Sequence, residues 1–442
     1  MNYEKTQSIR NVLHYVRRFK QKSAVIHIDD AVIDSPLFLS HIQDICLIHQ
    51  AGIQIVIVPG AKQTINTLLE KNSITWKEEN GFRITDEHAI PLIKTAAFDT
   101  ANRIMTSLAG NGHTALIGNW VKARGKGIID GVDYGTCGEI TKLESESIQS
   151  VLKNGFIPIF PCIGWSAVGK PYNISSADLA CELAIRLQAE KLFYVAPNIK
   201  IHSDIFFTPQ DAQIGEEKNI CAMSIEQAQC FIDENKEKAF PETENILKLT
   251  NLCVHACNNG VVRSHIVNGC ENGAILCEIF SDLGTGTMIY KSKYAGIRPM
   301  TQDDIPSVLN LMQPFVEQSI ILPRNEQNLS EQCDDYIVYE IDASIKACAA
   351  LHFYDEDFCQ AEVAALVVDE SCSCMGIGPK LIAYLTERAK QKQALSVFVL
   401  TTQSADWFES QGFKSDDIQS LPEKRKKRWN KKRSSKLFRL HL

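Results

Sequence analysis

The chain has 442 residues, 45% of them hydrophobic and 22% charged, and a formal net charge of −7 at pH 7. This length and composition predict a globular protein of about two to three domains and exclude a disordered chain. The excess of acidic residues argues against a nucleic-acid partner, because nonspecific binding to phosphates depends on an excess of Lys and Arg.

The N-terminus and the apolar runs predict a cytoplasmic protein without a membrane partner. The first five residues are polar and include Glu4, so they lack the basic and then apolar layout of a secretory signal. Apolar stretches such as Ile53 to Val58 are far shorter than the roughly 18 residues that a membrane-spanning helix needs. The 15 cysteines contain no CxxC pair, which predicts reduced thiols and no metal site.

Residues 7 to 21 are predicted to form an amphipathic helix. Ile9, Val12, Val16 and Phe19 recur there at helical spacing and form one apolar stripe. Because a lone helix with such a stripe packs on another surface, we interpret residues 1–22 as an oligomerisation helix.

Residues 23–293 alternate short Val- and Ile-rich runs with longer helical patterns. This alternation predicts an α/β domain whose mostly parallel sheet carries helices on both faces. One predicted helix, Ala177 to Leu187, places Leu179, Leu183 and Leu187 on a sheet-facing stripe. The predicted strands are Ala24–Ile28, Ile53–Val58, His113–Ile117, Phe156–Phe160, Lys191–Val195 and Arg263–Val267.

A second domain is predicted over residues 296–442. A short strand from Ile297 precedes Thr301, which is a predicted helix N-cap with the acid Asp304 three residues later. The remaining elements are predicted to be helices, strands Asp335–Glu340, Ile345–Phe353 and Glu362–Asp369, a glycine-containing turn, a helix, strand Ser396–Thr401 and a final helix. This order predicts an α+β domain with a ligand loop after its long strand.

The glycine-containing turn joins a strand to a helix. Gly376, Ile377 and Gly378 follow the strand, and backbone amides at such a helix N-terminus can hold a pyrophosphate without side-chain charge. Taken alone, the turn is better explained as a tight turn whose glycines supply permissive φ angles.

The surrounding motifs make this part of the chain specific. The strand, turn and helix resemble the acetyl-CoA-binding motif of the GNAT N-acetyltransferase superfamily, and within it the C-terminal part resembles the bacterial N-acetylglutamate synthase family. The resemblance implies that Leu366, Val367, Val368, Gly376, Ile377 and Gly378 bind acetyl-CoA. Ser373 stands where GNAT turns usually have Arg or Gln, so we expect a weakened affinity. The ordered motifs are Val399-Leu400-Thr401-Thr402, Trp407-Phe408 with Gly412-Phe413, Leu421-Pro422-Glu423, Trp429-Asn430, and Arg433 with Ser435-Lys436.

Acetyl transfer to an α-amine needs a base, because an amine with a pKa of about 8 is mostly protonated at pH 7. Glu362 matches the glutamate proposed as base in the synthase family; the alternative is a solvent-facing acid at a strand edge. Thr401 matches a hydroxyl residue proposed to serve the leaving thiolate; the alternative is simple β propensity.

Two arginines suit a substrate with two carboxylates, since a guanidinium binds a carboxylate with two hydrogen bonds. Arg324 and Arg433 match arginines of the family that contact L-glutamate. The alternative for Arg324 is a surface residue after a turn. For Arg433 the alternative is membership of a basic run, Lys424 to Lys436, on a solvated face.

The first domain resembles the amino-acid-kinase fold, most closely acetylglutamate kinase, but lacks that family's phosphate-binding residues. Phosphoryl transfer depends on positioning and charge neutralisation, so these losses predict an inactive kinase. The family's Lys-x-Gly-Gly is replaced by a run from His27 to Asp30, its second glycine-rich turn by a run from Val58 to Lys62, and its organising aspartate by Ala177.

The same domain resembles the arginine-binding region of arginine-inhibited kinases and synthases. The resemblance implies that Glu278 pairs with the cation of L-arginine, with His265, Ser281 and Gly284 lining the site. For His265 the alternative is an ordinary strand histidine. The N-terminal helix with Tyr15 resembles the helix that joins arginine-sensitive members into hexamers, which predicts a homo-oligomer.

The leading hypothesis is an N-acetylglutamate synthase inhibited by L-arginine, with acetyl-CoA as co-substrate. Three other readings stay open: an acetyltransferase for another amino acid or small amine, an inactive arginine sensor suggested by Ser373, and an active acetylglutamate kinase. The last requires phosphoryl transfer that the residues at His27, Asp29 and Ala177 are expected to prevent.

Overall fold

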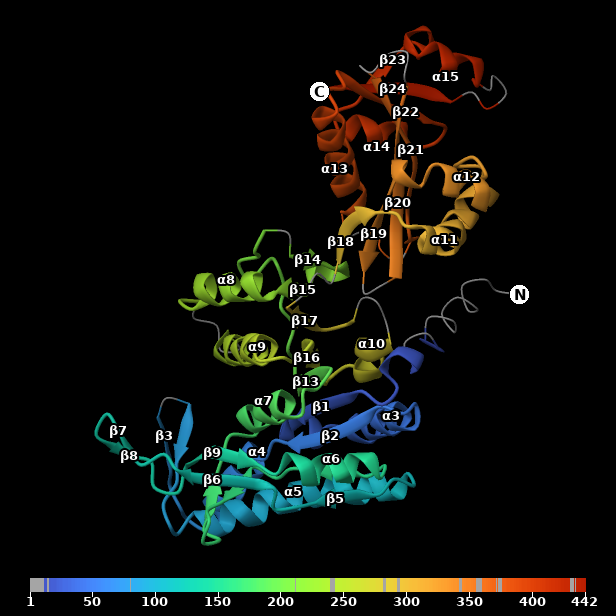
Figure 1. Cartoon of the computed structure of the whole chain (residues 1–442). Coiled ribbons are helices and arrows are strands. Elements are labelled where there is room, and N and C mark those ends of the chain that lie inside the picture. Colours follow the sequence, from blue (N-terminus) through green and yellow to red (C-terminus); the bar gives the residue numbers. More distant parts are fainter. Residues whose placement is uncertain are drawn as a thin grey trace. The chain divides into compact units, whose positions relative to one another are not determined.

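The computed structural model describes residues 12–13, 16–79, 81–210, 212–238, 243–280, 284–291, 295–341, 344–354, 360–370, 372, 376–429, 433 and 435–442. The chain forms two compact units, Met1–Ser292 and Lys293–Leu442 (Figure 1). In the described residues, no helix is both long and apolar enough to cross a membrane.

The first unit contains a nine-stranded sheet in the order β14-β15-β17-β16-β13-β1-β2-β10-β5. Strand pairs are parallel except β14–β15 and β16–β17, so the predicted mostly parallel sheet is confirmed. All six predicted strands are present. The strands are β1 (Ser23–Ile28), β2 (Gln54–Pro59), β5 (Ala115–Ile117), β10 (Ile157–Ile159), β13 (Lys191–Ala196), β14 (Gln213–Ile214), β15 (Ile220–Ser224), β16 (Arg263–Asn268) and β17 (Thr287–Tyr290).

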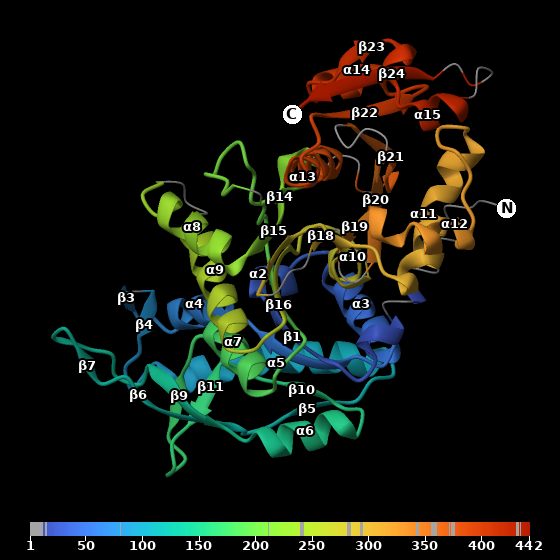
Figure 2. The same cartoon turned by 45° about the horizontal axis from the view of Figure 1, so that its top comes forward.

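Helices cover both faces of this sheet (Figures 1 and 2). Side chains of a strand alternate between the two faces, so Val25 of β1 lies in one buried cluster and Ala24 and Ile26 lie in the other. Leu179 and Leu183 are buried as predicted, in the first cluster. The helices are α2 (Asp30–Ile33), α3 (Phe38–Gln50), α4 (Lys62–Lys71), α5 (Ile90–Gly110), α6 (Ser145–Lys153), α7 (Ser176–Arg186), α8 (Ile225–Asn235), α9 (Thr243–Asn258) and α10 (Ala274–Phe280).

A second, four-stranded sheet and two hairpins extend the first unit beyond the sequence prediction. The sheet has the order β12-β11-β6-β9. Its strands are β6 (Val121–Gly125), β9 (Gly138–Leu143), β11 (Ile163–Trp165) and β12 (Pro171–Asn173), and the hairpins are β3 (Lys77–Glu79) with β4 (Phe82–Ile84) and β7 (Ile128–Ile129) with β8 (Val132–Asp133).

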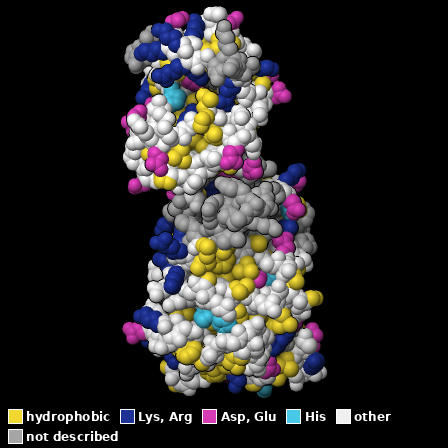
Figure 3. Space-filling view, turned by 90° about the vertical axis from the view of Figure 1, so that its right-hand side faces the viewer, with side chains coloured by type: hydrophobic (Ala, Val, Ile, Leu, Met, Phe, Trp, Pro, Cys, Tyr) yellow, Lys and Arg dark blue, Asp and Glu magenta, His cyan; other side chains and the backbone are white. Residues whose placement is uncertain are grey.

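The predicted N-terminal helix is described only in part. Residues 12–13 and 16–19 are helical, and Phe19 is buried in the core of the first unit. Ile9 and Tyr15 lie outside the described residues. On α3, Leu39 and Leu47 are 61% and 53% exposed, and Figure 3 shows hydrophobic side chains gathered on the side of the first unit that carries this helix. Surfaces of this kind often bind another protein.

The second unit is a seven-stranded mixed sheet in the order β18-β19-β20-β21-β22-β24-β23. Only β21 and β22 are parallel neighbours, and the predicted α+β class is confirmed. The strands are β18 (Ala295–Pro299), β19 (Tyr336–Ile341), β20 (Ser344–Phe353), β21 (Gln360–Val368), β22 (Ser396–Thr401), β23 (Lys414–Asp416) and β24 (Lys436–His441). The helices are α11 (Ile305–Glu317), α12 (Glu326–Glu331), α13 (Ile377–Gln391), α14 (Ala405–Ser410) and α15 (Glu423–Lys427).

The predicted N-cap at the start of this unit is confirmed, because Thr301 and Asp304 form a capping box. The prediction that the unit ends in a helix is wrong. After α14 the chain continues through β23 and α15 to β24, which pairs antiparallel with β22. Leu437 and Phe438 of β24 are buried, so burial stabilises the strand despite the charged residues around it.

Candidate active site

β21 and β22 diverge half-way along their length. Their parallel pairing ends at Val363 and Val399, although β21 continues to Val368. Ala365 has a φ of +51°, and one extra residue of β21 faces β20 at this point. This β-bulge bends β21, so the backbone of residues 364–368 does not pair with the described part of β22.

The three predicted cofactor-binding residues of β21 lie in this open segment. Val367 is buried in the core of the unit, whereas Leu366 and Val368 are half-buried. Backbone groups of an unpaired strand edge can bind an extended ligand as a neighbouring strand would. The segment therefore offers backbone donors and acceptors to a chain-like ligand such as the pantetheine arm.

The glycine turn forms the start of α13. Gly376 has a φ of +63°, which a side chain would strain, and a Cβ atom at Gly378 would lie 2.9 Å from Cζ2 of Trp407. Ile377 is buried, and Ser373 lies outside the described residues. The first turn of this 15-residue helix presents backbone N–H groups, which suit a pyrophosphate.

Glu362 is 4% exposed in β21, so the alternative of a solvent-facing acid is wrong. Arg425 of α15 donates hydrogen bonds from Nε to Oε2 at 2.8 Å and from Nη2 to Oε1 at 3.0 Å. The hydroxyl of Tyr354 also donates to Oε2. The sequence did not point to either partner, because a distant arginine and a tyrosine leave no spacing signal around Glu362.

Thr401 ends β22 and is buried. Its Oγ1 accepts a hydrogen bond from the backbone N–H of Ser404 at 3.0 Å, in the turn that leads to α14. Because this bond uses the oxygen as acceptor, the hydroxyl hydrogen remains to be donated to another group.

Arg324 and Arg433 come together although 109 residues separate them. Arg433 donates to the backbone carbonyl oxygens of Ser319 and Ile320, at 3.2 Å and 2.5 Å, which fixes it to the segment that precedes Arg324. Burial and the nearby charge of Arg324 lower the pKa of Arg433. Arg324 also lies beside the buried Tyr336, whose pKa burial raises to about 12 while the arginine opposes that rise. Two adjacent cations form a natural site for an anionic ligand.

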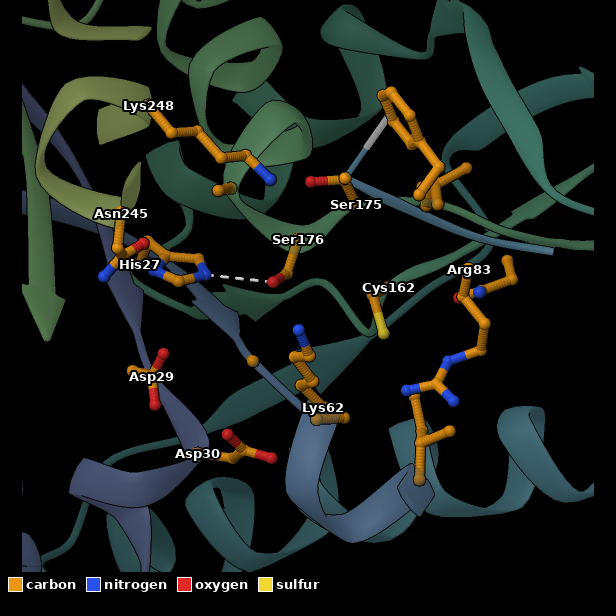
Figure 4. Close-up of a pocket in the computed structure, with 18 of the residues that line it drawn as sticks. His27, Asp29, Asp30, Lys62, Arg83, Cys162, Ser175, Ser176, Asn245 and Lys248 are labelled. Atoms are coloured by element: carbon orange, nitrogen blue, oxygen red, sulfur yellow. Dashed lines mark hydrogen bonds between the residues drawn. The ribbon is translucent and has the colours of Figure 1, made fainter. Parts of the chain in front are cut away.

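The first unit contains a cavity of about 490 Å³, lined by the residues at which the sequence predicts that a kinase site is lost. Figure 4 shows His27, Asp29 and Asp30 lining it from the end of β1, with Lys62 of α4 and Ser176 of α7 nearby. Ala177, which replaces the organising aspartate, also lines the cavity and offers only a methyl group.

The Asp30 carboxylate occupies the N-terminus of α4. Its Oδ2 accepts backbone hydrogen bonds from Gln63 at 2.5 Å and Thr64 at 3.3 Å. These N–H groups are the ones that would otherwise attract a phosphate. His27 supplies no compensating charge, because burial lowers its pKa to about 4, and its Nε2 lies 2.9 Å from the hydroxyl oxygen of Ser176.

Three predicted effector residues form one buried cluster. Nδ1–H of His265 donates to Oε1 of Glu278 at 2.6 Å, and the backbone N–H of Gly286 donates to Oε2 at 2.9 Å. A Cβ atom at Gly284 would lie 1.8 Å from the same carboxylate. Burial lowers the pKa of His265 to about 4, so its ring is neutral at pH 7. Ser281 lies outside the described residues.

Known proteins resemble both units. Residues 22–268 match the model of the amino acid kinase family, and residues 305–413 match the acetyltransferase (GNAT) family. An amino-acid acetyltransferase of Pasteurella multocida (strain Pm70) is 33% identical over 439 residues, which are 96% of this chain and 94% of the relative. One of Actinobacillus pleuropneumoniae serotype 7 (strain AP76) is 31% identical over 447 residues, covering 100% and 99%. The chain belongs to the amino-acid acetyltransferase family.

Solved structures give the same assignment over the whole chain. N-acetylglutamate synthase from Neisseria gonorrhoeae, complexed with coenzyme A and L-arginine, is 28% identical with a TM-score of 0.81, and 100% of each chain is covered. The same enzyme complexed with coenzyme A and N-acetyl-glutamate has a TM-score of 0.60 at the same identity and coverage. Amino-acid acetyl transfer is therefore the activity of this chain.

In this amino-acid acetyltransferase, the second unit carries groups suited to each part of the chemistry. The open edge of β21 and the start of α13 suit the acyl donor, and Arg324 with Arg433 suits a carboxylate. Glu362 is a buried carboxylate in the strand that carries the open edge. Sequence reasoning missed Arg425, which only its position inside the basic run could have suggested.

Proposed function

We propose that this amino-acid acetyltransferase moves the acetyl group of acetyl-CoA to the α-amine of L-glutamate. The observation that carries the proposal is the meeting of Arg324 and Arg433 in the same unit as the divergence of β21 and β22. Glutamate has two carboxylates, and two guanidinium groups match them in charge and hydrogen-bonding geometry.

The reaction is a direct transfer. The neutral amine attacks the thioester carbonyl carbon, a C–N bond forms, and the C–S bond breaks to release the thiolate of coenzyme A. Starting from the ammonium form of glutamate, one proton passes to Glu362 and on to solvent, and a second reaches the thiolate. Thr401, whose hydroxyl hydrogen is available, is proposed to donate to that thiolate.

Acetyl-CoA is proposed to bind along the open edge of β21 and at the start of α13. The pantetheine arm pairs with the backbone of Leu366, Val367 and Val368, and the pyrophosphate lies at Gly376, Ile377 and Gly378. The shape of β21 and the positive φ of Gly376 support this placement. No metal ion is required, because the backbone amides and arginines supply the positive potential.

The first unit is proposed to regulate the enzyme without phosphoryl transfer. Asp30 at the N-terminus of α4 and neutral His27 make the cavity unfavourable for nucleotide phosphates. We propose that L-arginine inhibits by binding Glu278 with its guanidinium, next to His265, Gly284 and Ser281. The relative from Neisseria gonorrhoeae complexed with L-arginine supports this proposal. Each oxygen of Glu278 accepts one hydrogen bond, so each retains a second acceptor position for the guanidinium.

We propose that the chain forms a homo-oligomer. The resemblance of the N-terminal helix implies that this oligomer is a hexamer. The exposed Leu39 and Leu47 on α3 support an interface on that side of the first unit. Light scattering of the full chain measures the mass, and a monomer at micromolar concentration would contradict the proposal.

The experiment that tests the proposed function is a reaction of purified protein with acetyl-CoA and ¹⁵N-labelled L-glutamate, read by mass spectrometry. We expect labelled N-acetylglutamate, with less product when L-arginine is added. A folded protein that binds arginine but acetylates nothing would favour the sensor reading, and acetylation of another amino acid alone would overturn glutamate as substrate. The Glu278→Gln variant should keep activity and lose inhibition by arginine.

A further inference from the structure

Glu362 is held by three hydrogen bonds from two residues. Arg425 contributes two of them, at 2.8 Å and 3.0 Å, and the phenol of Tyr354 contributes the third. The Arg425 and Glu362 side chains are only 16% and 6% exposed. Such an arrangement is far more ordered than a surface ion pair, whose side chains remain mobile in water.

We infer that Arg425 and Tyr354 are positioning residues that hold the Glu362 carboxylate in one orientation and aim its Oε1 atom at the substrate amine. The inference rests on the proposed role of Glu362 as the base. It goes beyond that role by naming the accepting oxygen and the two residues that orient it.

The hydrogen-bond pattern distinguishes the two carboxylate oxygens of Glu362. Oε2 accepts from both Nε of Arg425 and the Tyr354 hydroxyl, whereas Oε1, among the described residues, accepts from Nη2 of Arg425 alone. A carboxylate oxygen has two lone pairs, so Oε2 is saturated and Oε1 retains one free acceptor position. A proton from the substrate ammonium can therefore be received at Oε1, directly or through one water molecule.

Burial makes these partners important for Glu362. A buried polar group costs free energy unless hydrogen bonds replace those lost to water. Arg425 supplies two such bonds in a parallel arrangement that fixes the plane of the carboxylate. Tyr354 stays a donor, because burial and then the Glu362 charge raise its pKa. Its ring is stacked at 6.1 Å on Phe398 of β22, which fixes the hydroxyl.

Other charged groups around Glu362 are engaged elsewhere. His352, across the β20–β21 pair, has Nδ1 2.7 Å from Oδ2 of Asp335. Arg439 of β24 lies against the Phe398 ring and donates to Asp416. Arg428, the residue that follows α15, is close enough to Tyr354 to oppose the rise in the pKa of that tyrosine. Arg425 is the cation in direct contact with Glu362 among the described residues, so its removal is the decisive change.

The test compares Arg425→Met, Arg425→Lys and Tyr354→Phe with wild type in steady-state kinetics. For Arg425→Met we expect kcat to fall by at least about 10-fold, with KM for either substrate changing by less than about 3-fold. Arg425→Lys should restore part of kcat, because lysine can still donate to the carboxylate, and Tyr354→Phe should lower kcat by about 3- to 10-fold.

The matched control is Lys427→Met, which removes an exposed cation from the same helix and should leave both measurements unchanged. Circular dichroism checks folding, and Arg425→Lys provides a second variant if Arg425→Met does not fold. An unchanged kcat in a folded Arg425→Met variant would overturn the inference. A fully active Glu362→Gln would instead refute the base itself, and a wild type without N-acetylglutamate would refute the proposed function.

Discussion

The indole ring of Trp407 covers Gly378, so that a Cβ atom at position 378 would lie 2.9 Å from Cζ2 and 3.4 Å from Cη2. Trp407 lies in α14 and Gly378 in the first turn of α13, the proposed pyrophosphate site. The glycine therefore allows close packing at the point where the backbone must also approach the ligand.

Gly378→Ala should raise the Kd for acetyl-CoA by at least about 5-fold, because the methyl group pushes the start of α13 away from Trp407. Isothermal titration calorimetry with acetyl-CoA measures the affinity. Gly296→Ala is the control, since a Cβ atom there meets nothing within 4 Å. Equal affinity of the Gly378 variant and wild type would remove this turn from the cofactor site.

The two arginines give a prediction about substrate binding. Arg324→Lys and Arg433→Lys should each raise KM for L-glutamate by about 10-fold, and KM for acetyl-CoA by less than about 3-fold, because lysine cannot bind a carboxylate with two parallel hydrogen bonds. Arg388→Lys on α13, whose guanidinium donates to the Asp334 carbonyl oxygen, should change neither constant. Steady-state kinetics measures both constants. A larger rise in the KM for acetyl-CoA than in the KM for L-glutamate would contradict the assignment.

Local features of this site could be predicted from the sequence, and its long-range contacts could not. Gly376 and Gly378 follow a strand and precede a helix, a pattern contained in a few consecutive residues. The bonds from Arg425 to Glu362 join residues 63 positions apart, and they depend on where α15 packs. No periodicity in a single sequence records such a contact.

The same reasoning applies to the missed strand β24. It follows a basic run and carries Lys436, Arg439 and His441, so its composition does not stand out as a strand. Arg439 is buried because Asp416 and Ser396 accept its hydrogen bonds, and β22 provides the pairing. By contrast, β1, β2, β10 and β13 of the first unit are mainly apolar runs buried on both faces, and their composition identifies them.

Asp30 should stabilise the first unit as a cap of α4. Asp30→Ala removes the acceptor for two backbone N–H groups and is expected to lower the free energy of unfolding by about 1 kcal/mol. Thermal melting followed by circular dichroism measures the change, with the exposed Asp233→Ala as control. An unchanged melting temperature would show that α4 does not depend on this carboxylate.

The buried His265 predicts a pH dependence of stability. Its pKa is about 4 in the folded unit, against an ordinary value of 6.5, because burial disfavours the charged ring. Between these values the unfolded chain binds more protons, so stability falls as pH drops from 6.5 toward 4, by at most about 1.4 kcal/mol per pH unit. His27 acts in the same direction, and Asp29, whose pKa burial raises to about 6, acts against both.

A difference measurement isolates the contribution of His265. The melting temperature of His265→Gln should fall less than that of wild type between pH 6.5 and 4, because glutamine can still donate to Glu278 but does not titrate. His255→Gln, on the exposed side of α9, should follow wild type. Identical pH profiles for all three proteins would contradict a neutral, buried His265.

The most direct test of glutamate acetylation is a competition between L-glutamate and L-glutamine in one reaction with acetyl-CoA. Glutamine has the same shape but lacks the second carboxylate. Because the two substrates compete for one enzyme, the ratio of acetylated products gives the ratio of their kcat/KM values. The meeting of Arg324 and Arg433 predicts an excess of N-acetylglutamate of at least about 100-fold, falling toward 10-fold or less in Arg433→Lys. Equal acetylation of both amino acids would contradict recognition of two carboxylates by this pair.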